Sequence, residues 1–245
     1  FTPRFVTWFG YTATHIILAV ALAATAAICW TWMRNSPLWN PNTDPVVPKL
    51  AAASRLPITW QMSFLYAVAF GGFVAFSTYL PTFLKDVYSF DLTAAGTRTA
   101  GFAIAAVVAR PIGGILSDRI GPRAVLAVSL AGTTVLALVL AFRPPLEVAA
   151  GLSFVAIAFF LGLGTGGVFA WVAKAAPAER VGSVTGLVGA AGGLGGFVPP
   201  LIMGYVYGRT DSYAIGLWML SVTAVLTLLL TVTIVRRTAE QGAHA

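Results

Sequence analysis

The chain has 245 residues, of which 58% are hydrophobic and only 9% are charged. A soluble domain needs roughly a quarter of its residues charged to cover its surface, so this composition excludes an ordinary soluble protein and indicates a surface that faces lipid. The net charge of +7 does not indicate a nucleic-acid partner, because the basic residues are scattered between apolar segments instead of clustering on one of them.

Seven apolar segments are long enough to cross a bilayer, whose core of about 30 Å requires about 20 helical residues. In chain order they cover residues 12–33, 58–84, 94–117, 124–142, 148–173, 184–207 and 213–235. Backbone polar groups in lipid must be satisfied within the segment, which favours helices over short strands. The sequence therefore predicts an all-α membrane protein with seven transmembrane helices.

Basic residues orient these segments, because cytoplasmic loops carry an excess of Lys and Arg. We assign the side that follows the first helix as cytoplasmic, which places the larger basic set there and predicts an N-terminus outside and a C-terminus inside. The larger set is Arg34, Lys49, Arg55, Arg119, Arg123, Lys174, Arg180, Arg236 and Arg237, and the opposite set is Arg4, Lys85, Arg98, Arg143 and Arg209.

A glycine-rich charged loop joins the third and fourth predicted helices and reads GGILSDRIGPR over residues 113–123. It resembles the cytoplasmic loop signature of the major facilitator superfamily, although an ordinary charged loop is the alternative. Glycines let a helix end approach a neighbour closely, and an aspartate can lie at a helix N-terminus or pair with arginine. The expected role is a conformational latch formed by Gly113, Asp118, Arg119, Gly121 and Arg123.

The resemblance implies a carrier of twelve helices in two halves of six, with the substrate bound between the halves near the membrane midplane. Residues 1–34 then correspond to the last helix of the first half, 35–57 to a Pro- and Asn-rich cytoplasmic linker, 58–237 to the second half and 238–245 to a cytoplasmic tail. We expect the chain to be part of a longer carrier in the cytoplasmic membrane, with the missing N-terminal helices as its partner.

Arg110 is the one arginine that belongs to neither basic set, and the sequence places it about 12 Å inside the cytoplasmic face. A charge in the bilayer costs at least about 2.5 kcal/mol on insertion scales, so it marks a candidate functional site. A structurally paired arginine is the alternative, but no acidic residue lies within a predicted span. Tyr66 is expected at about 13 Å from the same face, and Phe70 follows one turn later on the same side of its helix.

Two glycine clusters lie near the same depth, in the fifth and sixth predicted helices. The first matches G-x-G-x-x-G over residues 162–167, but a dinucleotide site is excluded because the motif lies within a long apolar helix and does not follow a strand. Such glycines serve either close helix packing alone or packing combined with lining of a substrate site, and both readings stay open. The candidate lining residues are Gly164, Thr165, Gly192, Gly193, Gly195 and Gly196.

Three segments, YAVAFGGF at 66–73, ARPIGGILSDR at 109–119 and GGLGGF at 192–197, together resemble the nitrate/nitrite porter family. The resemblance implies a secondary active transporter of nitrate or nitrite without cofactor or metal. In it Arg110 holds the anion, Tyr66 donates a hydrogen bond to it and Phe70 stacks on it. The first half is then expected to supply a second arginine. The fifth helix departs from the family pattern, which often has asparagine where this chain has Thr165.

The sequence leaves the coupling mechanism open. Proton-driven carriers usually keep a carboxylate in the membrane core, and its absence from these spans favours anion exchange or proton coupling through the other half. A carrier of another small organic or inorganic anion and a non-transporting fragment remain alternatives. An enzyme is disfavoured, because no nucleophile–base pair and no set of metal ligands lies at a common depth.

Overall fold

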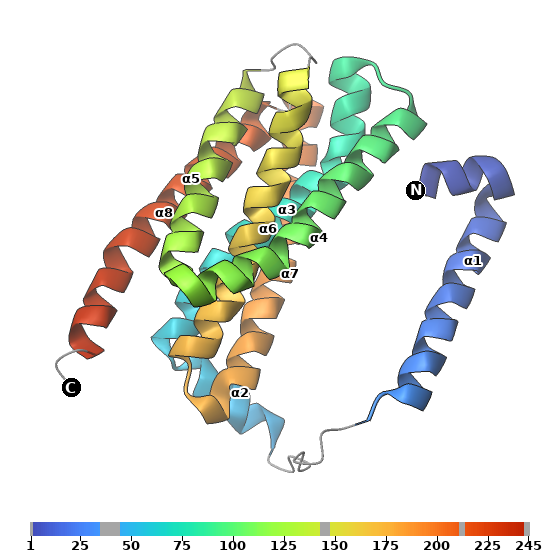
Figure 1. Ribbon diagram of the computed structural model, residues 1–245. Helices are drawn as coiled ribbons and strands as arrows, with labels where there is room; N and C mark the ends of the chain where they lie inside the picture. Colours follow the sequence, from blue (N-terminus) through green and yellow to red (C-terminus); the bar gives the residue numbers. More distant parts are fainter. Residues whose placement is uncertain (1, 35–44, 143–147, 211–213, 243–245) are drawn as a thin grey trace.

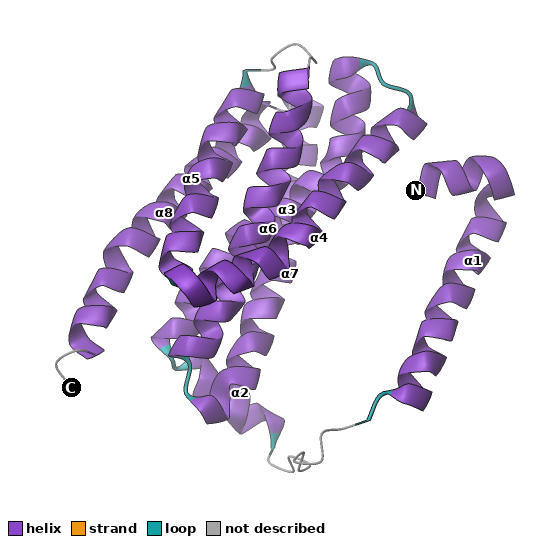
Figure 2. Cartoon of the chain, in the orientation of Figure 1, coloured by secondary structure: helices purple, strands orange, loops and turns teal. Residues whose placement is uncertain are grey.

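The computed structural model describes residues 2–34, 45–142, 148–210 and 214–242, and these residues are almost entirely helical (Figures 1 and 2). The helices are α1 (Thr2–Trp32), α2 (Val46–Ser54), α3 (Pro57–Tyr88), α4 (Leu92–Ile120), α5 (Pro122–Ala141), α6 (Val148–Ala175), α7 (Val181–Thr210) and α8 (Ala214–Gly242), with a 3-10 turn at Ala178–Arg180. Seven helices in the described residues are long and apolar enough to cross a membrane. The predicted all-helical membrane fold is therefore confirmed.

A short helix, α2, lies within the segment predicted as a linker, and the sequence analysis did not predict it. It is docked on the end of the bundle, because the Thr59 hydroxyl donates to the Ala53 carbonyl at 2.6 Å and the Trp60 indole donates to the Ser54 carbonyl at 2.8 Å. Residues 35–44 of the predicted linker, Arg143, and the predicted start of the last span at Tyr213 lie outside the described residues.

Helices α3 to α8 form one bundle, whereas α1 stands apart from it in Figure 1. Only 6% of the most apolar window of α1 is buried, compared with 50% for α3. In the bundle the helices pack in close pairs, α3 with α7, α4 with α6, and α5 with both α6 and α8. The pairing brings together segments that are far apart in the sequence.

The helix ends follow from local sequence. The Asp91 carboxylate caps α4, since its Oδ1 accepts hydrogen bonds at 2.9 Å from the backbone N–H groups of Thr93 and Ala94. The turn between α4 and α5 requires φ +89° at Gly121, which glycine adopts without steric cost, and Pro122 then starts α5. Gly121, one of the two glycines of the predicted latch, is therefore needed for the turn itself.

Two hydrophobic cores fill the bundle at different depths. The proximal core lies at the end next to α2 and contains Ala53, Met62, Tyr66, Leu126, Leu130, Val168, Trp171 and Val184, with Phe70 and Phe169 packed against it. The distal core lies at the other end and contains Leu80, Phe83, Phe102, Leu140, Phe154, Ile157 and Leu161, with Phe73 and Phe76 packed against it. The boundary between the two cores crosses α3 between Phe70 and Phe73.

Glycines allow the closest helix crossings. A Cβ at Gly71 of α3 would overlap backbone atoms of Gly195 on α7, and a Cβ at Gly113 of α4 would lie 2.9 Å from the Leu163 Cα on α6. Helices in membranes associate through close packing of small residues, because lipid provides no hydrophobic drive between them. Packing of α3 on α7 and of α4 on α6 thus explains the glycines at these crossings, whereas other glycines, such as Gly114 and Gly193, face open space.

Neighbouring glycines on α4 provide a test of this packing. Gly113→Ala should lower the thermal unfolding midpoint of the purified protein, because overpacking of this kind costs about 1–3 kcal/mol. Gly114→Ala should leave the midpoint unchanged or raise it, since an added Cβ there meets open space and alanine favours helix by about 1 kcal/mol. Equal midpoints for the two variants would contradict the close crossing of α4 and α6.

Candidate functional site

Arg110 of α4 is a half-buried cation that lies over two aromatic rings of α3. Its Cζ is 5.2 Å from the ring centroid of Phe70 and 5.0 Å from that of Phe73. Its Nε is buried and has no hydrogen-bond partner in the described part of the chain. A buried guanidinium N–H without a protein acceptor has hydrogen-bonding capacity left for a ligand.

The aromatic pair predicted from the sequence lies directly beside this arginine. Tyr66 and Phe70 are stacked with ring centroids 5.0 Å apart and an angle of 3° between the planes. Phe169 of α6 meets Tyr66 edge-on at 4.7 Å, and Tyr66 is only 8% exposed. The structure therefore brings Arg110, Tyr66 and Phe70 together, and it adds Phe169 as a third ring that packs behind Tyr66.

The predicted glycines of α7 separate into different positions. Gly192 lies against the aromatic pair, since a Cβ there would overlap the Tyr66 ring and lie 3.1 Å from Phe70. Gly195 and Gly196 pack instead on Ala67 and Val74 of α3, and Gly193 is exposed with open space around it. Of these four glycines, Gly192 alone contacts the predicted site.

The glycines of α6 serve mainly to bring that helix onto α4. A Cβ at Gly166 would overlap the carbonyl oxygen of Arg110, so this glycine lets α6 pass directly behind the arginine. Gly164 points elsewhere, toward Ser129 and Ala69. The buried Thr165 hydroxyl donates to the Gly162 carbonyl of its own helix at 2.6 Å. The structure does not bring Gly164 or the Thr165 hydroxyl to Arg110.

The Asp118 carboxylate of the predicted latch pairs with a lysine from another helix. Lys174, in the last turn of α6, lies 3.1 Å from Oδ1 of Asp118 and donates to the Ser117 carbonyl at 2.9 Å. Arg123 donates to the Val232 carbonyl of α8 at 2.8 Å, while Arg119 is exposed. The segment predicted as a loop is in fact helical apart from the turn at Gly121, because α4 continues to Ile120 and α5 starts at Pro122. Its contacts connect the end of α4 to α6 and the start of α5 to α8.

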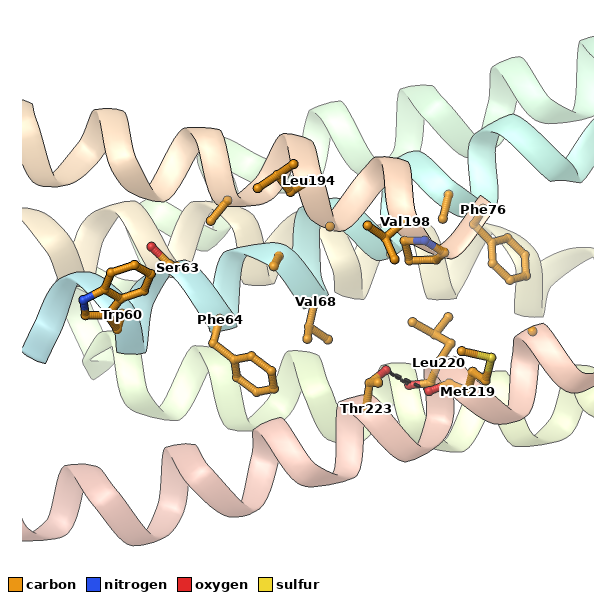
Figure 3. A pocket seen from close by; sticks show the side chains of 17 residues that line it. Trp60, Ser63, Phe64, Val68, Phe76, Leu194, Val198, Met219, Leu220 and Thr223 are labelled. Carbon is orange, nitrogen blue, oxygen red and sulfur yellow. Dashed lines mark hydrogen bonds between the residues drawn. The ribbon is translucent and has the colours of Figure 1, made fainter. Parts of the chain in front are cut away.

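A cavity of about 500 Å³ lies away from Arg110, between α3, α7 and α8 (Figure 3). Its lining is apolar and carries no charged side chain. The Thr223 hydroxyl in this cavity is already bonded to the Met219 and Leu220 carbonyls at 2.8 and 3.0 Å. The cavity therefore has no charged group to hold an ion, and the described residues also contain no cluster of potential metal ligands.

Sequence reasoning missed four contributors to these sites, namely Phe73, Gly166, Phe169 and Lys174. Phe73 ends the YAVAFGGF segment and lies one turn from Phe70, so helical spacing could have identified it. Gly166 belongs to the predicted glycine cluster at residues 162–167, but its contact with the Arg110 carbonyl depends on how α6 packs on α4. Phe169 and Lys174 act across helices, and their contacts depend on how α6 is rotated against α3 and α4.

Residues 84–244, more than half of the chain, match the Major Facilitator Superfamily. The chain belongs to this superfamily. The family assignment agrees with the multi-pass helical structure and with the GGILSDRIGPR signature at the end of α4. It also agrees with the transporter fold that the sequence predicts.

Curated relatives give a narrower similarity. The chain is 59% identical over 227 residues to the probable nitrate/nitrite transporter NarK2 of Mycobacterium tuberculosis, which covers 92% of this chain and 58% of the relative. It is 37% identical over 190 residues to the nitrite extrusion protein of Bacillus subtilis, covering 76% of this chain and 47% of the relative. The chain therefore spans about half the length of the curated relatives that it matches.

Solved structures support the fold. The major facilitator transporter FucP in its outward conformation superimposes with a TM-score of 0.63 at 18% identity, over 90% of this chain and 53% of that chain. The inward-open xylose transporter XylE of E. coli gives a TM-score of 0.58 at 19% identity, over 72% of this chain and 47% of that chain. At such low identity the likeness concerns the fold alone.

The ion pair between Asp118 and Lys174 allows a test of the predicted latch. In the full-length carrier, Asp118→Asn should change the transport rate and the balance of inward and outward states, with little change in affinity for the transported ion. Both side chains are largely exposed, so the pair contributes at most about 1 kcal/mol to stability. Transport assays and cysteine accessibility in each state measure these effects.

A double-mutant cycle provides the control for this prediction. Lys174→Gln should reproduce the change in state balance, and combining it with Asp118→Asn should add little, because each variant removes the same pair. Fully additive effects, or a large loss of intrinsic affinity with unchanged accessibility, would rule out the latch.

Proposed function

We propose that this chain forms the second half of a secondary transporter that moves nitrate, nitrite or both by alternating access. The names and high identity of the curated relatives support this substrate class. The single observation that carries the proposal is Arg110, a cation on a membrane-spanning helix with an unpartnered buried Nε and an aromatic face on α3. Intramembrane charges of this kind mark substrate pathways.

The geometry of the guanidinium suits a planar anion. Guanidinium presents paired, coplanar N–H donors that match two oxygens of a flat anion, which a lysine ammonium does not. The stacked rings of Tyr66 and Phe70 project from the side of α3 that faces Arg110 on α4. Flat rings beside the cation favour flat anions over tetrahedral ones such as phosphate, because only a flat anion can contact a ring face across its whole area.

The other half of the carrier completes the proposed site. We expect it to supply a second arginine, so that the anion is held from both halves near the midplane. The proposed location is the cytoplasmic membrane, with the N-terminus of this segment outside and its C-terminus in the cytoplasm, as the distribution of Lys and Arg favours. Arg119, Arg123 and Lys174 then lie on the cytoplasmic side.

The coupling that this half supports is anion exchange, or proton coupling through residues of the other half. Asp and Glu in the described residues lie at or beyond the ends of the spans, with Asp86 and Asp91 at one end of the bundle and Asp118 and Glu179 at the other. Without a carboxylate beside Arg110, the described residues of this half provide no carboxylate to accept a proton at the depth of the proposed site.

Replacing Arg110 with lysine in the full-length carrier is the test of the proposed function. The charge is retained but the two-pronged contact is lost, and loss of one charge-assisted hydrogen bond in a dry site costs about 1.5–3 kcal/mol, roughly ten- to a hundredfold in affinity. Binding of nitrate and nitrite to reconstituted carrier measures the effect. Arg98→Lys is the matched control, because Arg98 also lies on α4 over a ring, 3.9 Å from the Phe90 centroid, but is exposed.

Competition experiments separate nitrate from other anions. Phe70→Ala should weaken nitrate binding less than Arg110→Lys, and it should relax the preference for nitrate over chlorate and phosphate. If the wild-type carrier binds another small anion more tightly than nitrate, that anion would replace nitrate as the proposed substrate. Nitrate affinity near the wild-type value in Arg110→Lys would return this arginine to a structural role.

A further inference from the structure

The last residue of the YAVAFGGF segment, Phe73, has no part in the proposed contacts with the anion, yet its ring is as close to Arg110 as that of Phe70. The two centroids lie 5.0 and 5.2 Å from the Arg110 Cζ. The rings of Phe70 and Phe73 are 6.2 Å apart and tilted by 39°. The guanidinium is thus contacted by two rings that belong to successive turns of one helix.

The two rings differ in what stands behind them. Phe70 is stacked on Tyr66 in the proximal core. Phe73 is stacked on Phe102, with centroids 5.9 Å apart and planes 3° from parallel, and Phe102 is fully buried in the distal core. Phe102 also lies on α4, the helix that carries Arg110. Phe73 therefore bridges two side chains of α4, one a fixed ring and the other the cation.

Among the described residues, no hydrogen bond to Nε and no ion pair orients this cation. Its Nε has no hydrogen-bond partner, and no carboxylate of the described residues forms an ion pair with it. A guanidinium stacks on aromatic faces through both its charge and its flat shape. Without such a contact a long arginine side chain samples several rotamers, and ordering it then reduces the affinity for the ligand.

We propose that Phe73 is a positioning residue that holds the Arg110 guanidinium in the orientation required for a planar anion, with Phe102 fixing the ring of Phe73. In this proposal Phe70 contacts both the arginine and the anion, while Phe73 acts only through the arginine. This inference rests on the proposed function for its effect on nitrate, but the contact between Phe73 and Arg110 can be tested without any substrate.

The binding experiment compares ring-retaining and ring-removing variants of the full-length carrier. Phe73→Leu should weaken nitrate binding about five- to tenfold, the range expected for loss of a partly desolvated cation–π contact, and Phe73→Tyr should bind within about twofold of the wild type. Phe76→Leu is the matched control, because Phe76 lies on the same helix and stacks on the same Phe102 ring at 5.7 Å without contacting Arg110. Equal losses in Phe73→Leu and Phe76→Leu would overturn the proposal.

The substrate-free experiment is a double-mutant cycle on the thermal unfolding midpoint. Phe73→Leu should lower the midpoint more in the presence of Arg110 than in the Arg110→Met background, where only packing is lost. Phe76→Leu should lower it equally in both backgrounds. An additive cycle for Phe73 and Arg110 would overturn the positioning role. Failure of the wild-type carrier to bind nitrate would instead overturn the proposed function, and the cycle would still decide whether Phe73 holds the arginine.

Discussion

A guanidinium inside a lipid-embedded bundle must be stabilised by its protein surroundings, and much of the arrangement around Arg110 follows from this requirement. Removing a cation from water is costly unless other groups replace the lost hydration. Here the surroundings offer ring faces of α3 in place of a carboxylate. Those rings reach the arginine because α3, α4, α6 and α7 cross closely, and Gly166 and Gly192 provide the space that the crossings need. The glycines at these crossings and the intramembrane charge are therefore parts of one structural arrangement.

Among the residues that the structure describes, no carboxylate lies near Arg110, and this has a chemical consequence as well. An arginine that is already paired with an aspartate would have to exchange that partner for the transported anion, whereas ring faces leave the N–H edge of the guanidinium unoccupied. Aromatic contacts stabilise the cation without using its hydrogen-bond donors. This distinction makes the same residue compatible with the apolar interior and with reversible binding of a small anion.

Much of this organisation could be predicted from the sequence, because depth along a helix follows from the rise per residue. Arg110, Tyr66 and Phe70 were expected at one depth, and they lie together. The rotation of each helix about its axis was not predictable in the same way. Gly164 and Thr165 therefore lie on the expected helix but do not face the site around Arg110. The pairing of Asp118 with Lys174 and the docking of α2 depend on contacts between distant segments, which periodicity alone does not encode.

The two closest helix crossings divide the site between mechanical units. Backbone meets backbone where α3 crosses α7 and where α4 crosses α6. No side chain at these crossings can rotate to absorb sliding, so we expect each pair to move as one piece. Tyr66 and Phe70 belong to the first pair and Arg110 to the second. A shift of about 1 Å between the two pairs would change the distance from the guanidinium to the rings, and it would therefore change the affinity for the anion. A ligand held by both units would in turn resist that shift, so occupancy and shape of this half are thermodynamically linked.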